Sequence, residues 1–227
     1  MKNAKKIFRR CWITAGHSSL WNCDSTYCTV PYENLPSIDM ASDDLEWLDC
    51  VSSELKSVID LTSTLDSEDN QIGNLEAIVE KAGNIGLHIP NSFLRFFRNA
   101  ELQCKVPTCT ACYLGLSEDM IPLPNNEEHF LLRFMNDSQN CVLWYLCMSR
   151  NGESWVVASP YFFEPDIFEA INYDGVERDL IIGEALFCAE TFTKFLYRFW
   201  IENTIWYSLH NGLVLTPIQE EYRSQIK

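Results

Sequence analysis

Four cysteines in the middle of the chain have the spacing of a metal site. The pattern C-x4-C-x2-C, followed later by a single Cys, is the plant-type spacing of iron–sulfur ligands, and three of these thiols with one histidine could instead bind zinc. The candidate ligands are Cys104, Cys109, Cys112 and Cys141 for a cluster, with His129 completing a zinc site.

The local sequence does not favour either metal. The loop that joins the first three cysteines contains no glycine that would let backbone amides reach cluster sulfurs, and no second close pair of cysteines follows it. We therefore predict ordinary core and loop cysteines and no cofactor. Metal binding through Cys104, Cys109, Cys112 and Cys141 is the alternative function.

Two carboxylates and an imidazole lie next to one another at Glu127, Glu128 and His129. Such groups can act as a general base or as metal ligands. Adjacent side chains of a strand point to opposite faces, so these three cannot converge without help from elsewhere. The sequence also contains no G-x-S-x-G nucleophile motif and no glycine-rich phosphate loop with its lysine. We predict that the chain is not an enzyme.

Acidic residues gather in two segments that we expect to be loops at the ends of a sheet. Loops of this kind carry many of the contacts that proteins make with partners. In the second segment the acids alternate with aromatic residues, a composition that suits a binding surface. The predicted partner-binding residues are Glu118, Asp119, Glu127, Glu128, Phe163, Glu164, Asp166 and Asp174.

The charge of the whole chain indicates the same kind of partner. It has 32 acidic and 17 basic residues, for a formal net charge of -15, and five of the cations lie within the first ten residues. The body that follows repels phosphate backbones, so we expect no direct nucleic-acid binding. Its field would speed the encounter with a basic protein, although solubility alone would also explain it.

Composition also bears on the compartment. No apolar run approaches the roughly 20 residues that span a bilayer, so no membrane contact is expected. The basic segment Met1–Arg10 lacks the apolar stretch of a secretory signal. Ten cysteines are too few for a disulfide scaffold. We therefore expect reduced thiols and a cytoplasmic protein, and the sequence indicates no oligomeric state.

The elements that position these residues divide into helices followed by strands. Residues 1–41 are rich in Pro, Ser, Asn and Asp and are predicted to be weakly structured. Apolar residues at helical intervals predict helices at 43–58 and 74–83, separated by a polar linker at 62–70. A short aromatic helix is predicted from residue 91, just after a proline.

Segments rich in β-branched and aromatic residues predict strands, with Asn151-Gly152 as a hairpin turn. The strands are expected at 109–116, 129–135, 141–148, 155–161 and 180–187, and a long amphipathic helix at 190–210. The predicted fold is α+β, with an antiparallel sheet of about four to six strands and helices on one side. We predict an N-terminal extension with one helix at 1–71 and an α+β domain at 72–227.

Three stretches together resemble the SUKH superfamily over roughly residues 72–200. The first, GLHIPNSFLRFF at 86–97, resembles the family's Gly-x-x-Leu/Ile-Pro signature and the aromatic helix after it. The second, at 129–161, looks like the central strands, and AETFTKFL at 189–196 resembles the closing helix. Residues 98–101 replace a turn that is often Asn-Gly-Gly, so the chain resembles a divergent member.

The resemblance implies a compact α+β binding domain. Bacterial members of the family are commonly immunity proteins that neutralise toxins, often nucleases, and fungal members regulate cell-wall synthesis and signalling. A nuclease active site is basic, so an acidic inhibitor would complement it. The expected function is therefore an immunity protein that occludes the active site of a toxin, with a regulatory scaffold domain as a further alternative.

Overall fold

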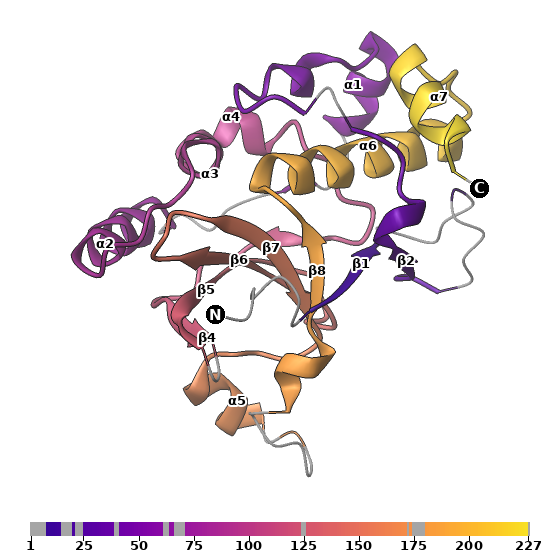
Figure 1. Cartoon of the computed structure of the whole chain (residues 1–227). Coiled ribbons are helices and arrows are strands. Elements are labelled where there is room, and N and C mark those ends of the chain that lie inside the picture. Colours follow the sequence, from indigo (N-terminus) through magenta and orange to yellow (C-terminus); the bar gives the residue numbers. More distant parts are fainter. Residues whose placement is uncertain are drawn as a thin grey trace.

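A mixed eight-stranded sheet lies at the centre of the computed structural model (Figure 1). The structure describes residues 8–14, 20, 25–38, 41–60, 64–65, 71–123, 126–171, 173 and 180–226. The strands are β1 (Arg9–Ile13), β2 (Thr29–Pro31), β3 (Tyr113–Leu114), β4 (Ile121–Leu123), β5 (Asn126–Asn136), β6 (Leu143–Ser149), β7 (Ser154–Ser159) and β8 (Leu186–Ala189). The α+β class is confirmed.

Within the ranges given above, four α-helices lie between β2 and β3, one lies between β7 and β8, and two follow β8. The α-helices are α1 (Ser53–Ile59), α2 (Gln71–Asn84), α3 (Asn91–Phe97), α4 (Ala100–Gln103), α5 (Pro165–Ile171), α6 (Phe192–His210) and α7 (Pro217–Ser224). Short 3₁₀ turns are η2 (Tyr32–Asn34), η3 (Glu46–Asp49) and η4 (Ile181–Glu184). The predicted aromatic helix and the long C-terminal helix are thus confirmed as α3 and α6.

The strand order is β2-β1-β8-β7-β6-β5-β3, and β4 pairs with β5. Neighbours are antiparallel except β1 and β8, which run parallel with Arg9 opposite Leu186. The hairpin between β6 and β7 turns at Gly152, whose φ of 84° suits glycine. The sheet is therefore larger than the four to six strands predicted, and it is mixed rather than antiparallel.

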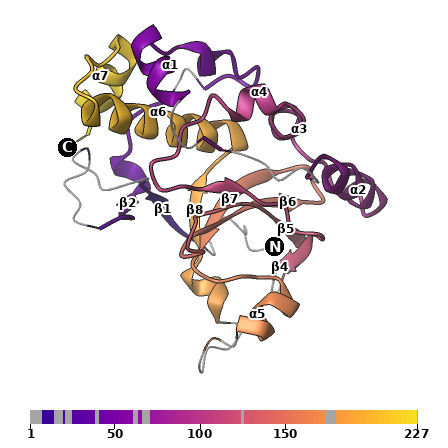
Figure 2. The same ribbon diagram turned by 180° about the vertical axis from the view of Figure 1, so that it is seen from behind.

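The central strand β6 is buried on both faces, as a strand between two layers must be. Its alternate side chains enter two different cores: Trp144 and Leu146 face the large helical layer, whereas Tyr145 and Cys147 face the other side. Figure 2 shows α3, α4, α6 and α7 over the first face and α5 beyond the second. The expectation of helices on one side only is wrong, since α5 and η4 cover the opposite core.

Aromatic rings fill the larger core. Phe192 and Phe195 of α6 pack on Phe134 of β5, with ring centroids 5.6 and 5.4 Å apart. Phe93 of α3 lies 4.9 Å from Phe192 by the same measure. The periodic aromatic residues of α3 and α6 are therefore core residues that hold the helices on the sheet.

The N-terminal segment belongs to this sheet and core. Trp12 of β1 is fully buried, and its Nε1 donates to Glu202 Oε2 of α6 over 2.9 Å. Tyr222 of α7 donates to the other oxygen of Glu202 and accepts from Arg198. Both the sheet and the core cross the boundary predicted between residues 71 and 72, and β1 and β2 lie within the segment predicted to be weakly structured.

Three other predicted elements are placed differently. The helix expected at 43–58 divides into η3 and α1, because Leu45 adopts a left-handed φ of 59° and Ser52 caps a new helix by accepting from the Leu55 N–H. The strand expected at 109–116 shortens to β3, since Ala111 also has a positive φ, of 52°. Residues 180–187 begin as η4 and only then join the sheet as β8.

Candidate functional site

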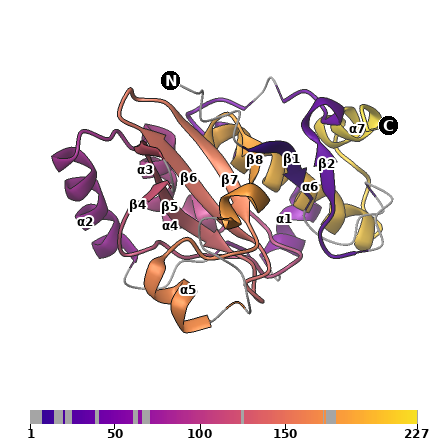
Figure 3. The same ribbon diagram turned by 60° about the horizontal axis from the view of Figure 1, so that its bottom comes forward.

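A cavity of about 510 Å³ opens where α2, the loop before β4, strand β5 and the start of α5 meet. Figure 3 shows α2, β4 and α5 on the same side of the molecule. The lining residues are Asn74, Leu116, Ser117, Glu118, Asp119, Ile121, Arg133, Glu164, Pro165, Asp166 and Ile167. We call this cavity the acidic cleft, since four of these side chains are carboxylates.

Both acidic segments predicted from the sequence meet in the acidic cleft. The loop with Glu118 and Asp119 is tied along β5, because the Ser117 N–H donates to the Arg133 carbonyl oxygen over 3.0 Å. Glu164 and Asp166 flank Pro165, the first residue of α5, and come in from the other side. The fold thus unites residues from two separate loops into one charged surface.

A buried ion pair forms the base of the acidic cleft. Arg133 Nε donates to Glu164 Oε1 over 2.6 Å, and the two side chains are only 11% and 12% exposed. Arg133 Nη1 also donates to the carbonyl of Gly115 at 3.1 Å and to Asn136 Oδ1 at 3.0 Å. A buried guanidinium needs partners of this kind, so Arg133 is fixed in place.

The second oxygen of Glu164 is also occupied. The Tyr145 hydroxyl donates to Glu164 Oε2 over 3.0 Å and accepts from the Phe163 N–H over 3.1 Å. Burial raises the pKa of Tyr145 well above its ordinary value, and the nearby Glu164 carboxylate raises it further. The phenol therefore stays protonated as a donor, and Glu164 is held at the base of the cleft rather than at its rim.

The rim of the acidic cleft carries exposed charge. Glu118, Asp119 and Asp166 are all solvent-exposed. Lys81 of α2 contacts the Asp119 carboxylate and donates to the Glu118 carbonyl over 3.2 Å. The cleft and its rim therefore contain four carboxylates but only two cations, the Arg133 guanidinium and the Lys81 ammonium. The resulting excess of negative charge attracts cations.

Close packing at Gly115 supports this arrangement. A Cβ there would lie 2.8 Å from Asn136 Nδ2 and 3.3 Å from Arg133 Nη1. Only glycine leaves room for Arg133 to reach the Gly115 carbonyl. Arg133, Tyr145 and Gly115 were not identified from the sequence, although a single cation in the apolar run FLLRFM could have indicated a buried partner.

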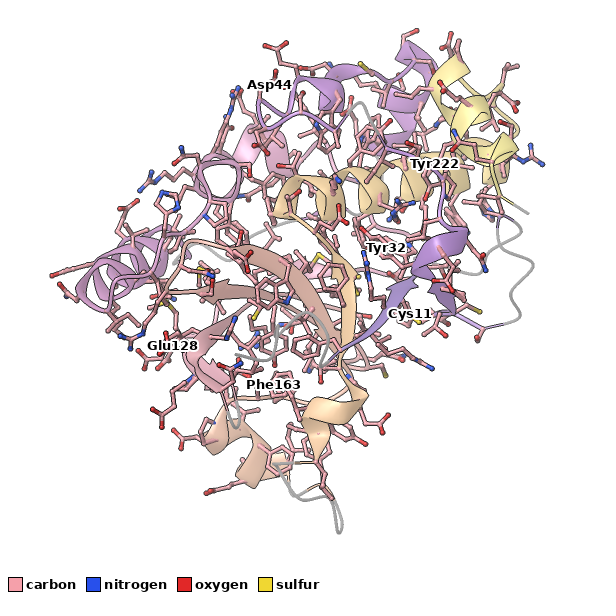
Figure 4. All side chains as sticks on the ribbon, in the orientation of Figure 1. Cys11, Tyr32, Asp44, Glu128, Phe163 and Tyr222 are labelled. Carbon is pink, nitrogen blue, oxygen red and sulfur yellow. The ribbon has the colours of Figure 1, made fainter. Side chains whose placement is uncertain are left out.

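The other predicted binding residues lie elsewhere. Glu127 and Glu128 are exposed at the start of β5, and neither lines the acidic cleft. Phe163 is fully buried, with its ring centroid 5.1 Å from that of Tyr145, so its prediction as a surface contact is wrong. Figure 4 shows Glu128 near β4 and Phe163 beneath the sheet. Asp174 lies outside the described residues.

The structure does not bring the four cysteines together as one group of ligands. Cys104 and Cys141 are exposed and Cys112 is buried, and the described part of the chain has no group of three or more His, Cys, Asp or Glu that could hold a metal ion. Burial raises the pKa of the Cys109 thiol to about 12, which disfavours the thiolate that metals bind. Cys28 is disulfide-bonded, in contrast to the expectation of reduced cysteines throughout.

Comparison of the chain with protein-family models, curated proteins and solved structures gave no match. The resemblance to the SUKH superfamily therefore stays a prediction. Among the helices within the described ranges, none has both the length and the apolar composition needed to cross a membrane.

Proposed function

We propose that this chain binds a basic partner protein through the acidic cleft, and that it acts as an immunity protein that occludes the active site of a toxin. The proposal depends on one observation: Glu118, Asp119 and Asp166, from two separate segments, lie together on the rim of one cavity. These exposed carboxylates can accept charge-assisted hydrogen bonds from Lys or Arg side chains.

The base and the rim of the cleft have different roles in this proposal. Arg133 and Glu164 satisfy each other, so they shape the cleft and leave its rim to contact the partner. A concave site whose base is already fixed by this ion pair needs less ordering when a partner binds. A toxin that acts on an anionic substrate has a basic active site, and the acidic rim would cover it in place of that substrate.

Binding can be tested with three versions of the chain. In the cleft variant, Glu118→Gln, Asp119→Asn and Asp166→Asn remove three carboxylates from the rim. In the control variant, Glu33→Gln, Asp60→Asn and Glu220→Gln remove three exposed carboxylates elsewhere, so both variants change the net charge equally. A fluorescent oligo-arginine peptide is the defined probe, and its dissociation constant is measured for each version.

We expect the cleft variant to bind the probe about tenfold more weakly than the other two versions at low salt. The difference should vanish as ionic strength rises from about 0.01 to about 1 M, because the Debye length falls from about 30 to about 3 Å. Equal binding by the cleft variant and the control variant would contradict the proposal.

The toxin assignment needs a separate measurement. Proteins retained by the wild-type chain but not by the cleft variant are identified by mass and then expressed alone and together with the chain. We expect a retained protein to arrest growth when expressed alone and to lose this effect beside the wild-type chain. Retention of harmless proteins only would contradict the immunity role while leaving binding through the cleft intact.

A further inference from the structure

A second cavity, of about 320 Å³, lies at the turn between β5 and β6 and shares no lining residue with the acidic cleft. The loop after α4, the turn between β5 and β6, the segment before β2 and helix α6 surround it. Its lining residues are Thr26, Tyr27, Cys109, Thr110, Ala111, Asp137, Ser138, Gln139 and Trp206. This volume is at the lower end of the range of about 300–1,000 Å³ found for small-molecule sites.

The wall of this cavity contains a buried carboxylate that forms no ion pair with any described residue. Asp137 is only 3% exposed, and its Oδ1 accepts a hydrogen bond from the Val142 N–H over 3.1 Å. No ion pair of the described residues includes Asp137, and the described residues that line the cavity include no Lys, Arg or His. A buried charge is costly unless a cation pairs with it, so the site as built favours a positively charged ligand.

Two aromatic rings also line the cavity. Tyr27 is half-buried, and its hydroxyl lies 3.8 Å from Cys112 Sγ. Burial raises the pKa of its phenol, and the nearby Asp137 carboxylate raises it further. Trp206 stacks on His210 with ring centroids 4.6 Å apart and planes 9° apart, which holds the indole in position. The faces of Trp and Tyr rings attract cations, and aromatic walls beside a carboxylate are the usual environment for alkylated ammonium groups.

We propose that this second cavity binds an alkylammonium group, with Asp137 as the counter-ion and Trp206 and Tyr27 as aromatic walls. The group could belong to a free small amine or to a methylated lysine side chain of a peptide. An anionic ligand is disfavoured because the described lining offers no cation to meet it. This proposal rests on different residues from the acidic cleft and does not depend on the function proposed above.

Calorimetric titration of the full chain can test the proposal with four probes. Choline represents a free amine, and a short peptide with trimethyllysine represents a side chain. The same peptide with unmodified lysine reports whether methylation matters, and 3,3-dimethylbutanol is the neutral counterpart of choline. We expect one of the cations to bind at least about tenfold more tightly than the neutral alcohol, and the stronger of the two cation sources identifies the ligand.

Two variants assign the binding to this cavity. Asp137→Asn keeps an oxygen that can accept from the Val142 N–H but removes the charge, so we expect cation binding to weaken by about tenfold. Trp206→Phe keeps an apolar ring with a weaker cation–π attraction, so a smaller loss is expected. Asp60→Asn, at an exposed carboxylate after α1, is the matched control and should bind like the wild type.

Three results would overturn the proposal. The first is a wild-type chain that binds none of the cations at millimolar concentration. The second is a neutral alcohol that binds as tightly as choline. The third is unchanged cation binding in Asp137→Asn, or in Trp206→Phe if the first variant does not fold.

Discussion

The ion pair at the base of the acidic cleft gives a quantitative prediction for Glu164→Gln. The substitution removes the charge that Arg133 meets at 2.6 Å while keeping nearly the same shape. Breaking a buried pair from one side costs about 3–5 kcal/mol. Arg133 keeps its bonds to Gly115 and Asn136, and both charged side chains retain about a tenth of their exposure, so the loss should be smaller.

The Tyr145 hydroxyl contributes to the same loss. It already accepts from the Phe163 N–H, so its own proton needs the Glu164 oxygen as an acceptor. A glutamine amide group turned toward Tyr145 would leave that proton unpaired, at a cost of about 1–3 kcal/mol. We expect Glu164→Gln to lower the free energy of unfolding by about 2–4 kcal/mol in total.

A double-mutant cycle with Arg133→Met separates the pair from its surroundings. Each single variant leaves one buried charge without its partner, whereas the double variant leaves none. The two losses should therefore be less than additive, by about 1.5–3 kcal/mol. Unfolding in guanidinium chloride, followed by tryptophan fluorescence, gives the four free energies. A Glu164→Gln loss below about 0.5 kcal/mol, or losses that add within about 0.5 kcal/mol, would refute this reasoning.

Four other predictions concern Gly115, Glu202 and the thiols. Gly115→Ala should destabilise the chain by about 1–3 kcal/mol, measured by the same unfolding assay, because its Cβ would press on Asn136 and Arg133; an unchanged midpoint would contradict this. Glu202→Gln leaves one side-chain oxygen to accept from two buried donors, Trp12 Nε1 and the Tyr222 hydroxyl. One donor then lacks a partner, so hydrogen exchange of the β1 backbone amides should become faster, with the amides of β6 as the reference. Burial raises the pKa of the Cys109 and Cys188 thiols to about 12, so at pH 8 iodoacetamide should label exposed Cys50, Cys104 and Cys141 first. Because the folded state holds these two protons more tightly than the unfolded state, stability should fall as pH rises from about 9 towards 12, and a midpoint that stays constant over that range would contradict the assignment.

The sequence predicts those parts of the fold that local patterns determine. The apolar periodicity of α6 and the Asn151-Gly152 turn between β6 and β7 are local signals, and both elements form where they were expected. Strand β1 was missed because its partner β8 lies at the far end of the chain, and no local pattern indicates a parallel pairing over that separation.

The candidate site also combines features that the local sequence predicts with features that depend on distant parts of the chain. Clusters of acidic residues are visible in the sequence, and four of the predicted side chains do line one cleft. The Arg133–Glu164 ion pair at the base of the cleft could not be predicted from the sequence. It forms only because the chain brings Glu164, just before α5, next to β5. Phe163 was misplaced for a similar reason: its aromatic ring lies beside acids in the sequence but beside Tyr145 in space.

The parallel pairing of β1 with β8 has a consequence for synthesis. Arg9 leaves the ribosome long before Leu186, its partner in the sheet. At about 5–20 residues per second, the interval is roughly 10–35 s. During that time β8 does not yet exist, so Trp12 and Ile13, which are buried in the core of the folded protein, remain exposed. The nascent chain must therefore keep an apolar strand from aggregating until β8 has emerged, so dependence on a chaperone during translation is expected.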